Sequence, residues 1–101
     1  MNTTILKDKL ITVLRQIQAE SGLGCPKLTG STRPVDSLPQ FDSITWPVAT
    51  TILATETSVP IPDDVNIFID ETTDLPRSID EIVDFVFDLA TKQNETERTA
   101  A

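Results

Sequence analysis

A serine at the predicted start of a helix is the residue of this chain whose type and position could do chemistry. Ser43 lies in the segment Phe41-Asp42-Ser43-Ile44, and Ile61-Pro62-Asp63 begins eighteen residues after it. The hydroxyl of such a serine can act as a nucleophile, accept a covalently attached group, or cap the helix beside Asp42. These three roles need different neighbours, so the rest of the sequence discriminates between them.

The residue types that are missing exclude most catalytic and metal chemistry. The chain of 101 residues has no histidine, so a Ser-His-Asp triad or a histidine-based metal site cannot be built. Cys25 is its single cysteine, which excludes an internal disulfide and a thiolate cluster. The carboxylates from Asp63 to Asp74 do not follow the spacing of a calcium-binding EF-hand loop. We therefore expect no hydrolase, no metal site and, given this cysteine usage, a cytoplasmic protein.

Composition limits the size of the fold and the kind of partner. An apolar content of 39% in 101 residues suits one small domain with one core. Sixteen acidic residues against eight basic ones give a net charge of −8, which repels nucleic acid and anionic lipid. No signal-peptide pattern or membrane-spanning apolar run is present. We expect a monomer that binds basic patches on partner proteins.

Helical spacing of apolar residues predicts an amphipathic helix at each end of the chain. The first has Thr4 as its expected N-cap and ends at Gly22, which suits a left-handed C-terminal position. The last opens with Ser78-Ile79-Asp80-Glu81, the pattern of a capping box, and from Lys92 on the chain reads as a frayed tail. The expected core stripes are Leu6, Leu10, Val13, Leu14 and Ile17 in the first helix, and Ile79, Ile82, Val83, Val86 and Leu89 in the last.

A second helix is predicted from Ser43 to about Thr57, with Asp42 capping its free N–H groups. Pro47 lacks an N–H and disfavours helical geometry at Trp46, so either the first turn is distorted or the regular helix restarts at Pro47. Its expected core face is Ile44, Val48, Ala49, Ile52 and Leu53.

The two connections of the predicted fold differ in character. The stretch Leu23–Phe41 is broken by prolines and glycine and reads as a long loop, pinned to the core by Leu28, Val35, Leu38 or Phe41. Val65–Ile69 alternates like a strand, but no partner strand is evident, so a short helical turn or packed loop is expected there. The predicted fold class is all-α: a bundle of three main helices plus a short helical turn, with a long first loop. We assign residues 1–92 to this domain and 93–101 to a flexible C-terminal tail.

Taken together, these motifs resemble the acyl carrier protein family. The Asp42-Ser43-Ile44 segment corresponds to the Asp-Ser-Leu motif that opens the family's second helix, and Ile61-Pro62-Asp63 follows at the family's spacing. The segments around Val65–Ile69 and from Ser78 correspond to the family's short third helix and last helix. Residues 70–77 look like an insertion relative to the shorter members. The resemblance covers most of residues 4 to 90.

The resemblance implies a carrier without turnover of its own. Ser43 would bear 4'-phosphopantetheine, attached by a phosphopantetheinyl transferase, and the arm would carry acyl groups as thioesters between acyl-transferring or condensing enzymes of lipid or polyketide-type biosynthesis. Asp42 would cap the helix and help the transferase recognise the site, and an aspartate rather than a histidine before the serine favours acyl over peptidyl cargo. Ile44 would adjoin the attachment site. A helix start also favours the charge of the phosphodiester by about 0.3–1 kcal/mol.

Two features of the second helix depart from the family pattern. Its face carries Thr45, Thr50, Thr51, Thr55 and Thr57, and Glu56 is its single acidic residue, so electrostatic docking through it should be weak. The acidic residues gather instead at positions 63–88, which hints at specialised partners. Trp46 lies near the place where carriers admit an acyl chain, so it could narrow the mouth of that pocket, although a tryptophan there is also typical of a packed core residue.

A different class of protein remains as the alternative. The chain could be an acidic helical protein-interaction module that has the carrier fold but no prosthetic group. Ser43 would then be a second capping residue beside Asp42, since serine is common at helix starts.

Overall fold

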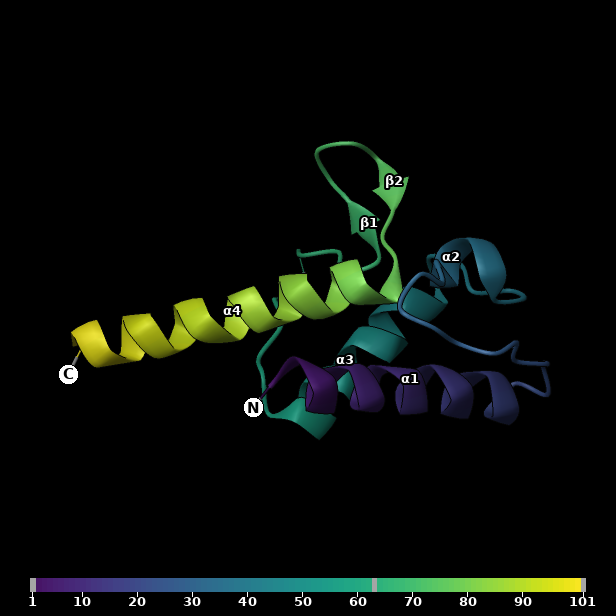
Figure 1. Ribbon diagram of the computed structural model, residues 1–101, viewed down its shortest axis with the longest axis horizontal. Helices are drawn as coiled ribbons and strands as arrows, with labels where there is room; N and C mark the ends of the chain where they lie inside the picture. Colours follow the sequence, from purple (N-terminus) through teal and green to yellow (C-terminus); the bar gives the residue numbers. More distant parts are fainter. Residues whose placement is uncertain (1, 63, 101) are drawn as a thin grey trace.

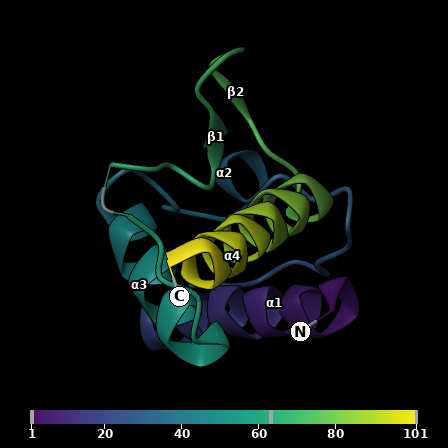
Figure 2. The same ribbon diagram turned by 90° about the vertical axis from the view of Figure 1, so that its left-hand side faces the viewer.

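The protein is mostly helical and carries one very small sheet. The structure, a computed structural model, describes residues 2–62 and 64–100, with side chains described as far as residue 92. Its elements are α1 (Thr3–Glu20), α2 (Pro34–Ser37), α3 (Thr45–Thr57), β1 (Ile69–Asp70), β2 (Leu75–Pro76) and α4 (Ile79–Ala100). Helix α1 packs against both α3 and α4, α3 flanks the other two, and α4 extends past them (Figures 1 and 2). Among the described residues, no helix combines the length and apolar character needed to cross a bilayer.

Helix α1 begins earlier than Thr4 and ends as predicted. Its N-cap is Asn2, whose Oδ1 accepts a hydrogen bond from the Ile5 N–H at 2.8 Å, so Thr4 as the cap was wrong. The helix ends in a Schellman motif, in which the N–H groups of Gly22 and Leu23 donate to carbonyls of the last turn. Gly22 has φ +71°, the left-handed conformation that glycine adopts without a steric penalty.

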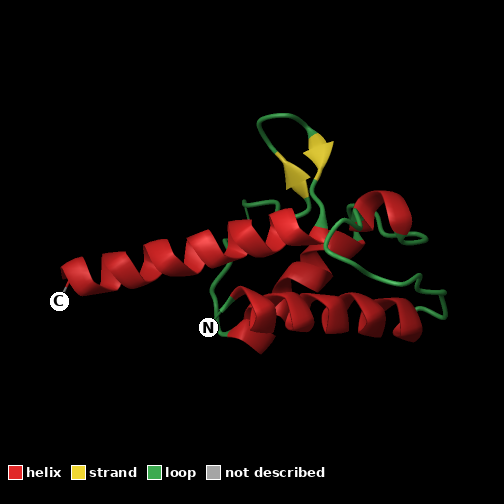
Figure 3. Cartoon of the chain, in the orientation of Figure 1, coloured by secondary structure: helices red, strands yellow, loops and turns green. Residues whose placement is uncertain are grey.

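The core lies between the stripes predicted for the first and last helices. All of those positions in α1 are buried, as are Ile79, Ile82, Val83 and Val86 in α4, whereas Leu89 is half-buried. The long loop contributes Leu28, Leu38 and Phe41 as buried residues and Val35 as a half-buried one, which confirms the predicted anchors. The loop also contains α2, a single helical turn that the sequence did not predict (Figure 3).

The first loop and the capping box together accept hydrogen bonds from the free backbone N–H groups at the start of α4. Ser78 and Glu81 exchange hydrogen bonds: the Ser78 N–H donates to Glu81 Oε1 at 2.9 Å, and the Glu81 N–H donates to Ser78 Oγ at 3.2 Å. The carbonyls of Thr32 and Gly30 accept from the N–H groups of Ile79 and Asp80 at 2.8 and 3.0 Å. The predicted capping box is therefore confirmed, and the loop reinforces it.

We expect Glu81 to make the stability of the fold depend on pH. The Ser78 N–H and then the Ser78 hydroxyl lower the pKa of the Glu81 carboxyl, as do the nearby charges of Arg33 and Arg77, against a smaller rise from desolvation. Since the pKa in the folded state lies below that of the unfolded chain, Glu81 stabilises the fold above its ordinary pKa of 4.5, and this contribution is lost as the pH falls through the folded-state value.

The variant Glu81→Gln isolates this effect because glutamine keeps the acceptor of the capping box but does not titrate. Urea unfolding at pH 6 and at pH 3 should show that the wild type loses more free energy of unfolding on acidification than Glu81→Gln does. Equal losses in the two proteins would contradict the assignment.

Residues 65–68 form a packed loop with Ile67 and Phe68 buried, so the loop alternative is confirmed there and the helical turn was wrong. Ile69 begins a hairpin that was not predicted. Ile69 pairs with Pro76 and Asp70 with Leu75, in antiparallel register. The partner strand lies inside the stretch 70–77 that looked like an insertion. The Asp70 side chain accepts from the N–H of Thr72 at 2.8 Å, and the Asp74 N–H donates to the Asp70 carbonyl at 2.7 Å, which closes the turn. The hairpin stands on the side of α4 opposite α1 (Figures 1 and 2).

Helix α4 runs to Ala100, through the segment that the sequence predicted to be a flexible tail. Side chains from residue 93 on lie outside the part of the chain that the structure describes. The division of the chain at residue 92 therefore stays a prediction.

Candidate functional site

Asp42 caps the helix that follows Ser43, as predicted. Its Oδ1 accepts hydrogen bonds from the N–H groups of Ile44 and Thr45 at 3.1 and 3.4 Å, and its carbonyl accepts from the Trp46 N–H at 3.1 Å. Ser43 is exposed, and no hydrogen bond of its side chain is found among the described residues. The serine hydroxyl is therefore accessible at a helix start whose free N–H groups Asp42 already satisfies.

Pro47 is accommodated within the first turn of α3. The helix is assigned from Thr45, two residues after the predicted start, and Ile44 before it already has helical φ and ψ of −76° and −36°. Pro47 is the third residue of α3, where the N–H of an ordinary residue would have few intrahelical partners. The regular helix consequently does not restart at Pro47.

The predicted core face of α3 was correct in part. Ala49 and Leu53 are buried and Ile52 is half-buried, but Ile44 and Val48 are 81% and 53% exposed. With 3.6 residues per turn, Ile44 lies about half a turn from the direction of Leu53. Ile44, directly after Ser43, and Val48, in the first turn of α3, therefore both face away from the core.

The chain that leads into the site is held by a buried glutamine of α1. Gln18 is only 1% exposed, and its Nε2 donates to the carbonyl of Pro39 at 3.0 Å. The next residue, Gln40, has φ +56°, a left-handed conformation that is uncommon for a residue with a side chain. Phe41 follows as a buried residue and Asp42 as the helix cap. Sequence analysis missed Gln18, since nothing local indicates a contact with a residue 21 positions away.

Gln18→Met should lower the free energy of unfolding by about 1–3 kcal/mol, because the carbonyl of Pro39 loses its donor. The matched control is Gln16→Met on the same helix. The exposed side chain of Gln16 bonds to Glu20, and its replacement should change stability by less than about 0.5 kcal/mol. Urea unfolding measures both. Similar values for the two variants would show that the hydrogen bond from Gln18 to Pro39 contributes little.

Trp46 is half-buried and joins the loop before Ser43 to α3. Its Nε1 donates to the carbonyl of Phe41 at 3.2 Å, and its own carbonyl accepts from the Thr50 hydroxyl at 2.8 Å. The ring packs against the core. The hydrogen bond to Phe41 thus fixes the Nε1 edge of the ring, and Trp46 also lines the neighbouring pocket.

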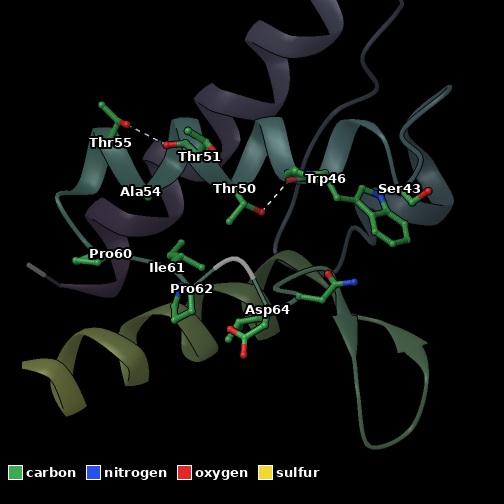
Figure 4. A pocket seen from close by; sticks show the side chains of 13 residues that line it. Ser43, Trp46, Thr50, Thr51, Ala54, Thr55, Pro60, Ile61, Pro62 and Asp64 are labelled. Atoms are coloured by element: carbon green, nitrogen blue, oxygen red, sulfur yellow. Dashed lines mark hydrogen bonds between the residues drawn. The ribbon is translucent and has the colours of Figure 1, made fainter.

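A pocket of about 670 Å³ lies between α3 and the segment after it. This volume falls in the range of about 300–1,000 Å³ that small-molecule sites occupy. Ser43 and Trp46 are at one end, and Thr55 and Pro60 are at the other (Figure 4). The wall from α3 and its start is made by Ser43, Trp46, Pro47, Thr50, Thr51, Ala54 and Thr55, and the opposite wall by Pro60, Ile61, Pro62, Asp64, Val65 and Asn66.

The predicted site residues are brought together only in part. Ser43 and Trp46 line one pocket, Asp42 orders the helix start beside it, and Ile44 faces outward. Leu53, which shares helical spacing with Trp46, is buried in the core rather than in the pocket. The sequence does not indicate the opposite wall, above all Asn66, because the proline-rich segment that carries it has no regular periodicity. Asp63 lies outside the described residues.

The acidic residues after α3 are spread over two elements. In the described part of the chain, Asp64 lines the pocket and the others lie at the hairpin and along α4. On α4, Asp80 pairs with Lys7 at 3.2 Å, Glu81 with Arg33 at 3.3 Å and Asp88 with Lys92 at 3.1 Å. No group of acidic or cysteine side chains suited to a metal ion is found among the described residues. Steering of partners by these charges stays a prediction.

Family models, curated proteins and solved structures give no match to this chain. The site must therefore be interpreted from its own geometry.

Proposed function

We propose that the protein is a discrete acyl carrier whose Ser43 bears 4'-phosphopantetheine. The observation that carries the proposal is an exposed serine hydroxyl at a capped helix start, on the rim of a pocket of ligand size. A modifying enzyme needs this hydroxyl to be accessible, and the arm needs space beside it. When attached, the group supplies a thiol that carries an acyl chain as a thioester.

The residues around Ser43 have distinct roles in this proposal. Ser43 Oγ forms the new bond to phosphorus and releases the nucleotide part of coenzyme A, while the transferase takes the hydroxyl proton. Asp42 keeps the helix start in place, and the N-terminal end of the α3 dipole stabilises the phosphodiester charge by about 0.3–1 kcal/mol. The lack of histidine is no obstacle, because the transferase supplies the catalysis.

Trp46 is proposed to border the mouth of the pocket used by the cargo. It is the single tryptophan of the chain and lies at the Ser43 end of the pocket (Figure 4). Its fluorescence should therefore change when the arm is loaded with acyl groups of increasing length. An unchanged spectrum across that series would assign Trp46 to the core alone.

Intact-mass measurement tests the proposal. The protein is incubated with coenzyme A and a broad-specificity phosphopantetheinyl transferase, and its mass should rise by one phosphopantetheine that peptide mapping assigns to Ser43. An unchanged mass would favour the alternative, an interaction module without a prosthetic group, for which the exposed Ile44 and Val48 beside Ser43 would be the contact surface.

A further inference from the structure

The turn that leads into Ser43 has a backbone conformation that its own residues do not favour. The Phe41 N–H donates to the Leu38 carbonyl at 3.4 Å and closes a β-turn. Its two central residues are Pro39, whose ring holds φ at about −65°, and Gln40, which has φ +56°. A negative φ followed by a positive one is the pattern of a type II turn, which normally has glycine or asparagine at the second central position.

A type I turn would suit the same four residues better. It accepts proline at the first central position and a negative φ at the second, so Gln40 would avoid the steric cost of the left-handed region. Both turn types reverse the chain, and they differ by a rotation of the peptide between the two central residues. That rotation reverses the direction of the Pro39 carbonyl. A contact outside the turn must therefore favour the observed direction.

The contact is made by the buried carboxamide of Gln18. Its Nε2 donates to the Pro39 carbonyl at 3.0 Å and to the Gly24 carbonyl at 3.5 Å. These two carbonyls lie near the two ends of the first loop, so one side chain of α1 ties both ends. Gln18 is 1% exposed. In a type I turn the Pro39 carbonyl would point away, and a buried donor would lose its partner, which is unfavourable.

Short-range contacts join the turn to the start of α3. The Asp42 N–H donates to the Gln40 carbonyl at 3.0 Å. Asp42 Oδ1 in turn accepts from the N–H groups of Ile44 and Thr45. Ser43 lies between the capping residue and the residues that it caps, so a displacement of the turn changes where the serine hydroxyl is presented.

We propose that Gln18 is a positioning residue for Ser43: by donating to the Pro39 carbonyl, it holds the turn in the type II form and ties the start of α3 to α1. Without this donor, the steric cost at Gln40 leaves the type II form in about one molecule in ten. The Asp42 cap then opens more often. The effect on modification rests on the proposed function of Ser43, whereas the effect on the turn does not.

NMR of the unmodified protein measures the turn type. A type II turn brings the Gln40 N–H close to the Pro39 Hα and gives a strong nuclear Overhauser effect between them, and a type I turn gives a weak one. The effect should be strong in the wild type and weak in Gln18→Met. It should be strong again in the double variant Gln18→Met/Gln40→Gly, because glycine adopts a positive φ freely. An equally strong effect in Gln18→Met would overturn the proposal.

Substitutions at the exposed Gln40 test the turn without removing a core contact. A β-branched residue tolerates a positive φ poorly, so Gln40→Val should shift the turn toward type I even with Gln18 present. Exchange of the Ile44 and Thr45 N–H protons with water should be about tenfold faster in Gln18→Met and about fivefold faster in Gln40→Val, and unchanged in Gln40→Gly. Unchanged exchange in both Gln18→Met and Gln40→Val would refute the link between the turn and the helix start.

The rate of Ser43 modification gives the functional readout. With a phosphopantetheinyl transferase, Gln18→Met should raise the KM for the protein about tenfold and leave kcat unchanged, because only molecules with the turn in place bind productively. The double variant should restore KM. Ile82→Val is the control, since it lowers stability through the core without touching the turn, and its KM should equal that of the wild type. An unchanged KM in Gln18→Met, or an equal rise in the control, would refute the positioning role.

Failure of the carrier assignment would give a different set of results. If the transferase does not modify the wild type, while the turn and the hydrogen exchange respond to Gln18→Met as expected, Ser43 is not the attachment site and Gln18 still positions the helix start. If the wild type is modified and the turn does not respond to Gln18→Met, the carrier assignment stands and the role of Gln18 is refuted.

Discussion

We expect Ser43→Ala to abolish the mass increase with coenzyme A and a phosphopantetheinyl transferase, because Ser43 supplies the exposed hydroxyl of the proposed attachment and the nearby Thr45 hydroxyl bonds to Asp42 Oδ1. The fold should be unaffected. Ser43 is exposed, its side chain has no hydrogen bond among the described residues, and Asp42 supplies the cap. The free energy of unfolding should therefore change by less than about 0.5 kcal/mol, as for other exposed positions.

The matched control for this prediction is Ser31→Ala. Ser31 is also exposed but lies in the first loop, far in sequence from the pocket, so its variant should be modified as fully as the wild type. Intact mass and urea unfolding are measured on all three proteins. Equal modification of Ser43→Ala and the wild type would show that the group is attached at another residue. The carrier assignment at Ser43 would then have no basis.

Phe68→Ala will produce the largest loss of stability among the predictions made for this protein. Phe68 is completely buried, and its ring meets that of Phe41 edge-on, with centroids 5.0 Å apart and planes at 82°. Truncation of a buried phenylalanine costs about 3–5 kcal/mol. A domain of this size is stable by about 5–15 kcal/mol in total, so the variant should lie close to its unfolding transition at room temperature.

The effect should reach the candidate site because Phe41 directly precedes Asp42. We expect Phe68→Ala to expose Trp46 to water, seen as a red-shifted fluorescence spectrum, at urea concentrations that leave the wild type folded. Phe68→Leu retains more apolar volume, so its free energy of unfolding should fall less than that of Phe68→Ala. This variant keeps the prediction testable if the alanine variant does not fold. Phe87→Ala is the surface control, since Phe87 is 38% exposed. A loss for Phe68→Ala no greater than that of the control would contradict this description of the core.

The parts of the fold that the sequence predicts well are those with strong local signals. The stripe of α1, the left-handed Gly22 and the capping box of Ser78 and Glu81 each depend on residues within a few positions of one another. The face of α3 was predicted correctly only in part because apolar residues occur all around this helix, so periodicity cannot fix its rotation. Packing against α1 decides that Ala49 and Leu53 turn inward while Ile44 turns outward.

The hairpin and half of the pocket depend on contacts that no local pattern encodes. Each strand has two residues, and the pairing relies on the Asp70 turn rather than on alternation. At the site, Ser43, Asp42 and Trp46 could be identified from the motif and its spacing. Gln18 could not, because the carbonyl to which it donates belongs to Pro39, 21 positions away. Asn66 could not, because the fold of the segment after α3 places it on the wall of the pocket.

The loops around the site are anchored in part through their main chain. Gln18, Trp46 and Arg77 each donate to a main-chain carbonyl, of Pro39, Phe41 and Asn66 respectively. Every amino acid supplies such a carbonyl, whereas the donor side chains are specific. A substitution at an accepting position therefore leaves its anchoring hydrogen bond possible, whereas loss of a donor removes it. A distant relative should be recognised by the donors Gln18, Trp46 and Arg77 rather than by the residues that accept from them.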